Sequence, residues 1–103
     1  MDCKVEAGED TVRITVAGRI DEAGAEDLKE HLQGVDTSNL KDAVIDLGQV
    51  TYLGSAGVGK LLLFYKAVAS REGRVSIVNI PSEIYQHFKR VKLDDIFVLR
   101  AAP

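Results

Sequence analysis

The chain has 103 residues and a formal net charge of −3, with 46% hydrophobic and 28% charged residues. A chain of this length can bury enough surface to fold without a disulfide or a metal, so we expect residues 1–103 to form a single domain. No run of Lys or Arg exceeds two, which disfavours nucleic-acid binding because that function needs a clustered basic face. No apolar run approaches the roughly 20 residues of a membrane-spanning helix, so we expect no direct membrane insertion.

Cysteine usage bears on the compartment. Cys3 is the only cysteine, so no internal disulfide can form, and no basic-then-apolar leader precedes it. Both features indicate a reducing, cytoplasmic environment.

The first third of the chain predicts a β-hairpin followed by a helix. Strands at Lys4–Ala7 and Thr11–Ala17 flank a turn at Gly8–Asp10, and the second strand alternates apolar and polar residues, which indicates that one face is buried. Helical spacing of apolar residues predicts a helix over Glu22–Gln33, with Asp21 as its N-cap.

The rest of the chain alternates strands and helices. The apolar run Ala43–Leu47 predicts a central strand covered on both faces, and Val75–Val78 predicts another buried strand. Helices are expected over Ser55–Ser70 and from Pro81 onward, and Ile96–Leu99 predicts a last strand. The order β-β-α-β-α-β-α-β indicates an α/β fold with a mixed β-sheet, an N-terminal hairpin and β-α crossovers.

A glycine-rich segment begins the helix that we expect at Ser55. Residues Gly54–Lys60 fit G-x-x-x-x-G-K, the start of a phosphate-binding P-loop. The next residue is Leu61 instead of the Ser or Thr that would hold magnesium, and the strand Val75–Val78 ends in Asn79 where an acidic metal partner would stand. A small P-loop-like nucleotide-binding protein is therefore the least favoured interpretation.

The same segment has a plain structural interpretation and a functional one. Ser55 stands at the expected start of a helix, where it can cap free backbone N–H groups or accept a phosphate that those groups stabilise. Gly57 and Gly59 either let the helix pack tightly on the sheet or open space for a partner. Asp46 is expected to order the turn after its strand by accepting N–H groups.

The residues from Val44 to Leu62 resemble the signature of the STAS family, the sulfate-transporter and anti-sigma factor antagonist domains. That signature is a strand ending in Asp-Leu, a hydrophobic-x-hydrophobic step, then Asp-Ser-(Ser/Ala)-Gly and a helix that opens with an apolar residue and Gly. Matching segments are Asp46-Leu47, Val50, Tyr52-Leu53, Ser55-Ala56-Gly57 and Val58-Gly59. Gly18–Asp21 and Val91–Phe97 resemble two further family motifs.

This resemblance implies a mixed sheet with helices mainly on one face. It also implies an anti-sigma factor antagonist that binds an anti-sigma factor, often a GHKL-type serine kinase, and is released when Ser55 is phosphorylated and reset by a phosphatase. The chain would be a substrate and binding partner, not an enzyme, and would need no cofactor. The implied partner-binding residues are Asp21, Gly54, Ser55, Ala56, Gly57, Val58 and Gly59, with Asp46 as a structural residue near the site.

One residue departs from the family pattern. In phosphorylated members an Asp usually precedes the serine, and here Gly54 stands in its place. This departure favours the alternative of a non-phosphorylated STAS subunit of a membrane transporter, such as a lipid-transport ABC system.

Overall fold

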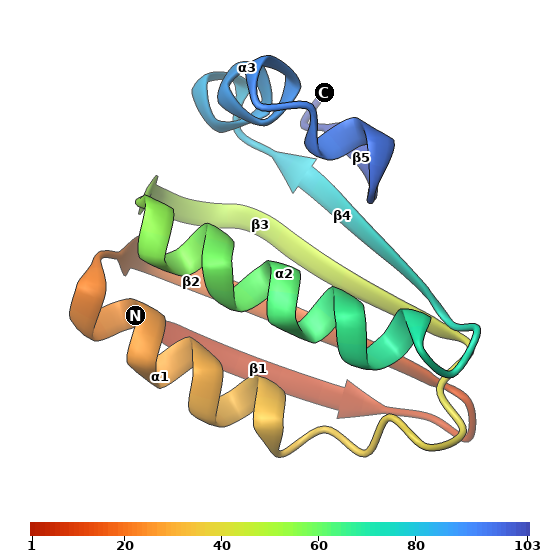
Figure 1. Ribbon diagram of the computed structural model, residues 1–103. Coiled ribbons are helices and arrows are strands. Elements are labelled where there is room, and N and C mark those ends of the chain that lie inside the picture. Colours follow the sequence, from red (N-terminus) through yellow and green to blue (C-terminus); the bar gives the residue numbers. More distant parts are fainter.

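The computed structural model describes residues 1–103 as a five-stranded mixed sheet with three helices (Figure 1). The strands lie in the sheet in chain order; β1 is antiparallel to β2, and the other neighbours are parallel. The predicted α/β class and order of elements are confirmed. The elements are β1 (Asp2–Ala7), β2 (Thr11–Ile20), α1 (Glu22–Gln33), β3 (Asp42–Leu53), α2 (Ser55–Ala69), β4 (Arg74–Ile80), α3 (Ser82–Arg90), the 3-10 turn η1 (Leu93–Asp95) and β5 (Val98–Ala101).

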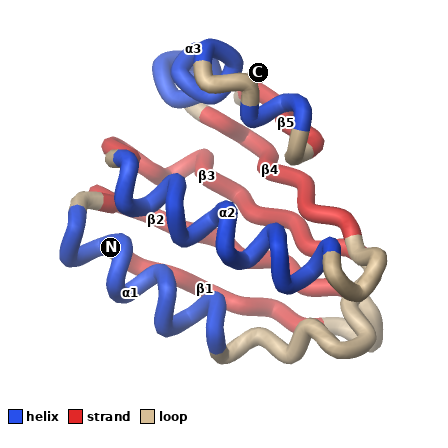
Figure 2. Tube along the Cα trace, in the orientation of Figure 1, coloured by secondary structure: helices blue, strands red, loops and turns tan.

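Helices α1 and α2 lie side by side over one face of the sheet (Figure 2). Period-two alternation in β2 sends Val12, Ile14 and Val16 toward these helices, and all three side chains are buried. The apolar stripe of α1, which includes Leu28 and Leu32, packs onto them. Removing one such side chain, as in Leu28→Ala, typically destabilises a domain by about 2–5 kcal/mol. No helix combines the length and the apolar character that a membrane crossing demands.

The prediction that the central strand is covered on both faces is wrong. In β3, Ala43, Ile45 and Leu47 are buried, whereas Val44 and Asp46 are only partly buried. The two long helices cover a single face, so alternate residues of β3 point to the other face. We call that other face the open face.

Strands β2 and β3 both run farther than predicted and reach Ile20 and Leu53. Two register shifts between them, one beside Gly48 and one beside Thr51, absorb residues that read as a turn in the sequence. Gly18 accommodates a φ of 93° within β2, a backbone conformation that favours glycine. The extension carries the ends of both strands to the start of α2.

The last strand begins two residues later than predicted, at Val98. Turn η1 precedes it and places Phe97 in the core, where its ring meets Tyr65 edge-on at a centroid distance of 5.3 Å. The apolar residues Ile96 and Phe97, which suggested the start of a strand, thus connect η1 to β5, with Phe97 buried and Ile96 exposed.

Candidate functional site

The candidate site lies where the carboxyl ends of β2 and β3 meet the first turns of α1 and α2. Parallel strands followed by helices bring these ends together at one edge of a sheet. Residues Arg19 and Ile20 pair with Tyr52 and Leu53 in adjacent strands, and the Gly54 N–H donates to the Ile20 carbonyl at 3.0 Å. The candidate serine therefore begins its helix from a firmly anchored strand end.

Ser55 is exposed and is the first residue of α2. Of the two interpretations of Ser55, the one in which it caps the helix is wrong, because the backbone of Gly54 is extended (φ −90°, ψ 175°) and the Gly54 carbonyl accepts the first helical hydrogen bond from Val58. No side chain caps α2, so N–H groups of its first turn keep their capacity to bind an anion. The first turn also holds no acidic side chain.

Gly57 and Gly59, two residues apart, have different surroundings. A Cβ added to buried Gly57 would lie 2.5 Å from Leu53 Cδ1 and 2.7 Å from Ile20 Cγ2, so this glycine permits close packing of α2 on the strand ends. A Cβ added to Gly59 would meet nothing within 4 Å. Of the two interpretations, tight packing on the sheet is confirmed for Gly57, and the space that the partner interpretation needs is present only at Gly59.

Asp21 is the N-cap of α1, as predicted. Its carboxylate accepts the Gly24 N–H at 2.9 Å and lies 3.6 Å from Arg19 Nε. The Gly24 hydrogen bond first, and the Arg19 charge after it, hold the pKa of Asp21 below its ordinary value of 3.8. Asp21, which directly follows β2, is therefore ionised at neutral pH, beside the end of β3 that leads to Ser55.

Arg19 and Tyr52 form a pair that sequence reasoning missed. The Arg19 guanidinium lies 4.2 Å from the Tyr52 ring centroid, and the tyrosine is 43% exposed. A Cβ added to Gly54 would lie 3.1 Å from the Tyr52 hydroxyl. The tyrosine thus covers the place where an aspartate side chain would begin. Only the register shifts between β2 and β3 bring this pair together, and those leave no clear signal in the sequence.

The other predicted partner residues lie along the first turns of α2. Ala56 and Val58 are partly buried and pack against the core, so they offer only part of their surface. Lys60 lies 3.6 Å from Glu26 of α1 and forms a surface ion pair between the two helices. Because residues from Ser55 onward are helical, no loop is available to cradle phosphates, and the P-loop interpretation is wrong.

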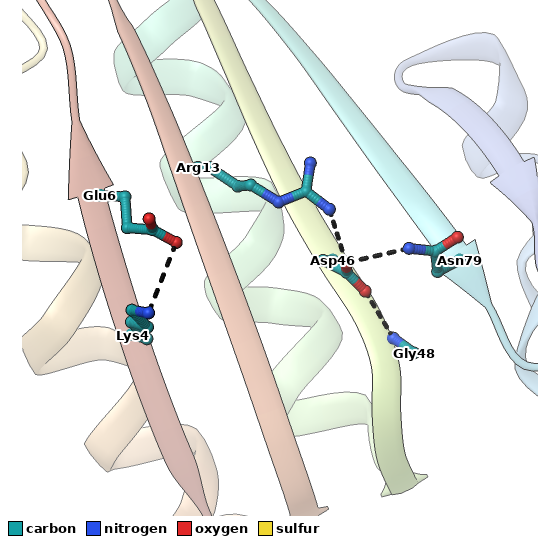
Figure 3. A network of polar contacts seen from close by, with 6 residues as sticks. All are labelled: Lys4, Glu6, Arg13, Asp46, Gly48 and Asn79. Atoms are coloured by element: carbon teal, nitrogen blue, oxygen red, sulfur yellow. Dashed lines mark hydrogen bonds and ion pairs between the residues drawn. The ribbon is translucent and has the colours of Figure 1, made fainter.

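Asp46 lies away from this edge, which corrects the expectation that it stands near the site. It sits seven residues before the end of β3 on the open face, where it accepts hydrogen bonds from Arg13 (2.6 Å), the Gly48 N–H (2.9 Å) and Asn79 (2.9 Å), as Figure 3 shows. Partial burial raises the pKa of Asp46, but these three donors outweigh it and hold the pKa below its ordinary value. The prediction that Asp46 accepts backbone N–H groups is confirmed by the hydrogen bond from the Gly48 N–H.

The sequence matches the family described as STAS domain over residues 3–102. The anti-sigma-B factor antagonist of Listeria monocytogenes is 28% identical over 91 residues, which cover 88% of this chain and 80% of that protein. The crystal structure of an anti-sigma factor antagonist from Mycobacterium paratuberculosis superimposes with a TM-score of 0.83 at 26% identity, covering 96% of this chain and 84% of that one. The Bacillus cell fate determinant SpoIIAA in its phosphorylated form has the same fold, with a TM-score of 0.74 at 17% identity and coverage of 95% and 90%.

Proposed function

Because the chain belongs to the STAS domain family, we propose that it is an anti-sigma factor antagonist that acts by partner switching. Unphosphorylated, it binds an anti-sigma factor that is a GHKL-type serine kinase, and phosphorylation of Ser55 releases it until a phosphatase restores the hydroxyl. The observation that carries the proposal is an exposed Ser55 at the start of an uncapped helix. The similarity to anti-sigma factor antagonists of Listeria monocytogenes and Mycobacterium paratuberculosis supports the same function.

The first turn of α2 suits both the transfer and its product. In the transfer, Ser55 Oγ forms a bond to the γ-phosphorus of the kinase's ATP, the bond from that phosphorus to ADP breaks, and the hydroxyl proton passes to a base of the kinase. The new phosphate adds about −1.5 to −2 charges, which the free N–H groups and the helix dipole stabilise. The fold is retained while the contact surface gains negative charge.

Release then follows from electrostatics and desolvation. A partner that packs on Ser55, Gly59 and the exposed face around them must desolvate the group at Ser55, which is either a hydroxyl or a phosphate. A neutral hydroxyl that finds a hydrogen-bond partner costs little to bury, whereas burying a phosphate without a cationic partner costs far more hydration free energy. The protein is already net negative, so an acidic contact surface on the partner would add repulsion.

Phosphorylation by the cognate kinase, followed by mass spectrometry, tests the site. Ser82 is a matched control because it too is exposed and begins a helix that has no side-chain cap. We expect one phosphate on the wild-type protein and on Ser82→Ala, and none on Ser55→Ala. Equal phosphorylation of Ser55→Ala and wild type would reject Ser55 as the acceptor.

Gly54 favours a second candidate, a STAS subunit of a membrane transporter that docks through the same edge without phosphorylation. Tyr52 covers the position where the family's aspartate would stand, so a kinase that reads that acid would find an aromatic ring and Arg19 instead. Co-purification with an ABC permease, unaffected by Ser55→Glu, would support this candidate. Binding to an anti-sigma factor that Ser55→Glu abolishes would exclude it.

A further inference from the structure

Strand β1 is the edge of the sheet, and its outer side has no partner. It pairs only with β2, and none of the hydrogen bonds outside the helices and strands involves residues 2–7. Every residue of β1 except Cys3 is exposed, including Val5, which is 39% exposed on the helix-covered side. A row of unpaired N–H and C=O groups on a six-residue strand is a template for another strand.

The charges on this edge are self-complementary. Lys4 and Glu6 lie on either side of Val5 and project from the same face of β1 (Figure 3). If two copies of β1 pair antiparallel with Val5 opposite Val5, Lys4 of each copy faces Glu6 of the other. Cys3 then faces Ala7. The strand therefore presents two opposite-charge pairs and no like-charge pair to its own copy.

Within one chain, the Lys4–Glu6 contact is weak. The atoms are 3.9 Å apart and the side chains are 74% and 57% exposed, so the pair contributes little to the free energy of folding. Residues two apart on a strand are about 6.6 Å apart at their Cα atoms, whereas directly opposite residues bring their Cβ atoms to about 4.5–5.5 Å. Pairing across two strands is thus the better geometry for both side chains.

The opposite edge of the sheet lacks these properties. Strand β5 has four residues, Val98–Ala101, with a register shift against β4 and no acidic residue to face Arg100. It offers fewer backbone groups and no complementary charge pattern. The difference between the two edges selects β1 as the strand that a second copy fits.

We propose that the protein forms a homodimer in which two β1 strands pair antiparallel about Val5 and join the two sheets into one. The two open faces become continuous, as do the two helix-covered faces. The dimer leaves Ser55 accessible, because that residue follows β3, two strands away from β1. One pair of six-residue strands buries less surface than a standard interface of about 1,600 Å², so the dimer is weak and concentration-dependent.

Charge reversal at the edge tests the proposal. Analytical ultracentrifugation at low salt should show the wild-type mass rising from 11.2 kDa toward twice that value as the concentration reaches the millimolar range. Lys4→Glu places four acidic side chains across the pair and Glu6→Lys places four basic ones, so each single variant should remain monomeric. The double variant Lys4→Glu/Glu6→Lys restores the opposite-charge pairs and should dimerise like wild type.

A mixture of Lys4→Glu and Glu6→Lys gives the most specific test of the charge pairing. One carries two acidic residues around Val5 and the other two basic ones, so the mixture should form a heterodimer although neither variant dimerises alone. Hydrogen exchange in residues 2–7 should also slow with concentration, whereas exchange in residues 98–101 should not. A wild-type protein that stays monomeric at millimolar concentration, or a mixture that stays monomeric, would overturn the proposal, and neither result bears on the function proposed for Ser55.

Discussion

Two polar regions of this protein use their side chains in opposite ways. On the open face, Asp46 satisfies its carboxylate with three donors from β2, β3 and β4, and the group is 15% exposed. At the carboxyl ends of β2 and β3, Ser55 is exposed at the start of a helix that no side chain caps. The polar groups around Asp46 hold three strands in register. The Ser55 hydroxyl makes no such bond and remains available to a partner.

Among the residues compared between these two regions, the largest change in stability is expected at Gly57, where α2 packs on the ends of β2 and β3. Gly57→Ala places a methyl group within 2.7 Å of Ile20 and Leu53, and such overpacking should lower the free energy of unfolding by about 2 kcal/mol. Urea unfolding measures the change. An unchanged midpoint would mean that the helix can move away from the sheet without loss.

Asp46→Ala should lower the free energy of unfolding by about 1–2 kcal/mol, because Arg13, Asn79 and the Gly48 N–H lose their acceptor. The affinity for the partner should not change, since the hydrogen bonds of Asp46 lie away from Ser55 and the ends of β2 and β3. Weakened binding by a fully folded Asp46→Ala protein would break the contrast between the two regions.

Asp46 also predicts a pH dependence. Its pKa is lower in the folded protein than its ordinary value of 3.8, so its stabilisation is fully present above that value and is lost as the pH falls through the lowered pKa. The difference in stability between wild type and Asp46→Ala should therefore shrink well below pH 3.8. A difference that stays constant into that acid range would show that the charge is not what stabilises the strands.

Gly59→Ala is the counterpart of Gly57→Ala. Nothing lies within 4 Å of the added Cβ, and alanine is the better helix former, so stability should rise by about 0.5–1 kcal/mol. Partner affinity should fall because the methyl group projects into the proposed contact surface. A gain in stability with unchanged affinity would remove Gly59 from that surface.

The smallest change in stability is expected for Arg19→Ala, because this side chain is 63% exposed and its contact with Tyr52 contributes about 0.5 kcal/mol. Its effect should appear in partner affinity instead. Arg74→Ala is the matched control, since Arg74 is 70% exposed and paired with Asp42 at the other end of the strands. Equal affinities for the two variants would show that Arg19 lies outside the contact.

Periodicity and turn residues were enough to predict the order of elements, the α1 bounds and the Asp21 cap. The site's finer geometry depends on contacts that are distant in sequence. Gly54, whose backbone is extended, occupies the N-cap position in place of Ser55, and Arg19 meets Tyr52 because of two register shifts. Gly57 and Gly59 look equivalent in the sequence, and only the packing of α2 on Ile20 and Leu53 separates them.

The central claim is that charge on Ser55 controls partner binding without refolding the chain. Isothermal titration of the cognate anti-sigma factor against Ser55→Glu and Ser82→Glu tests it most directly, with circular dichroism to verify that both remain folded. We predict that Ser55→Glu weakens the affinity by at least about tenfold, or roughly 1.4 kcal/mol, and that Ser82→Glu binds like wild type. Equal affinity for Ser55→Glu and wild type would contradict the account.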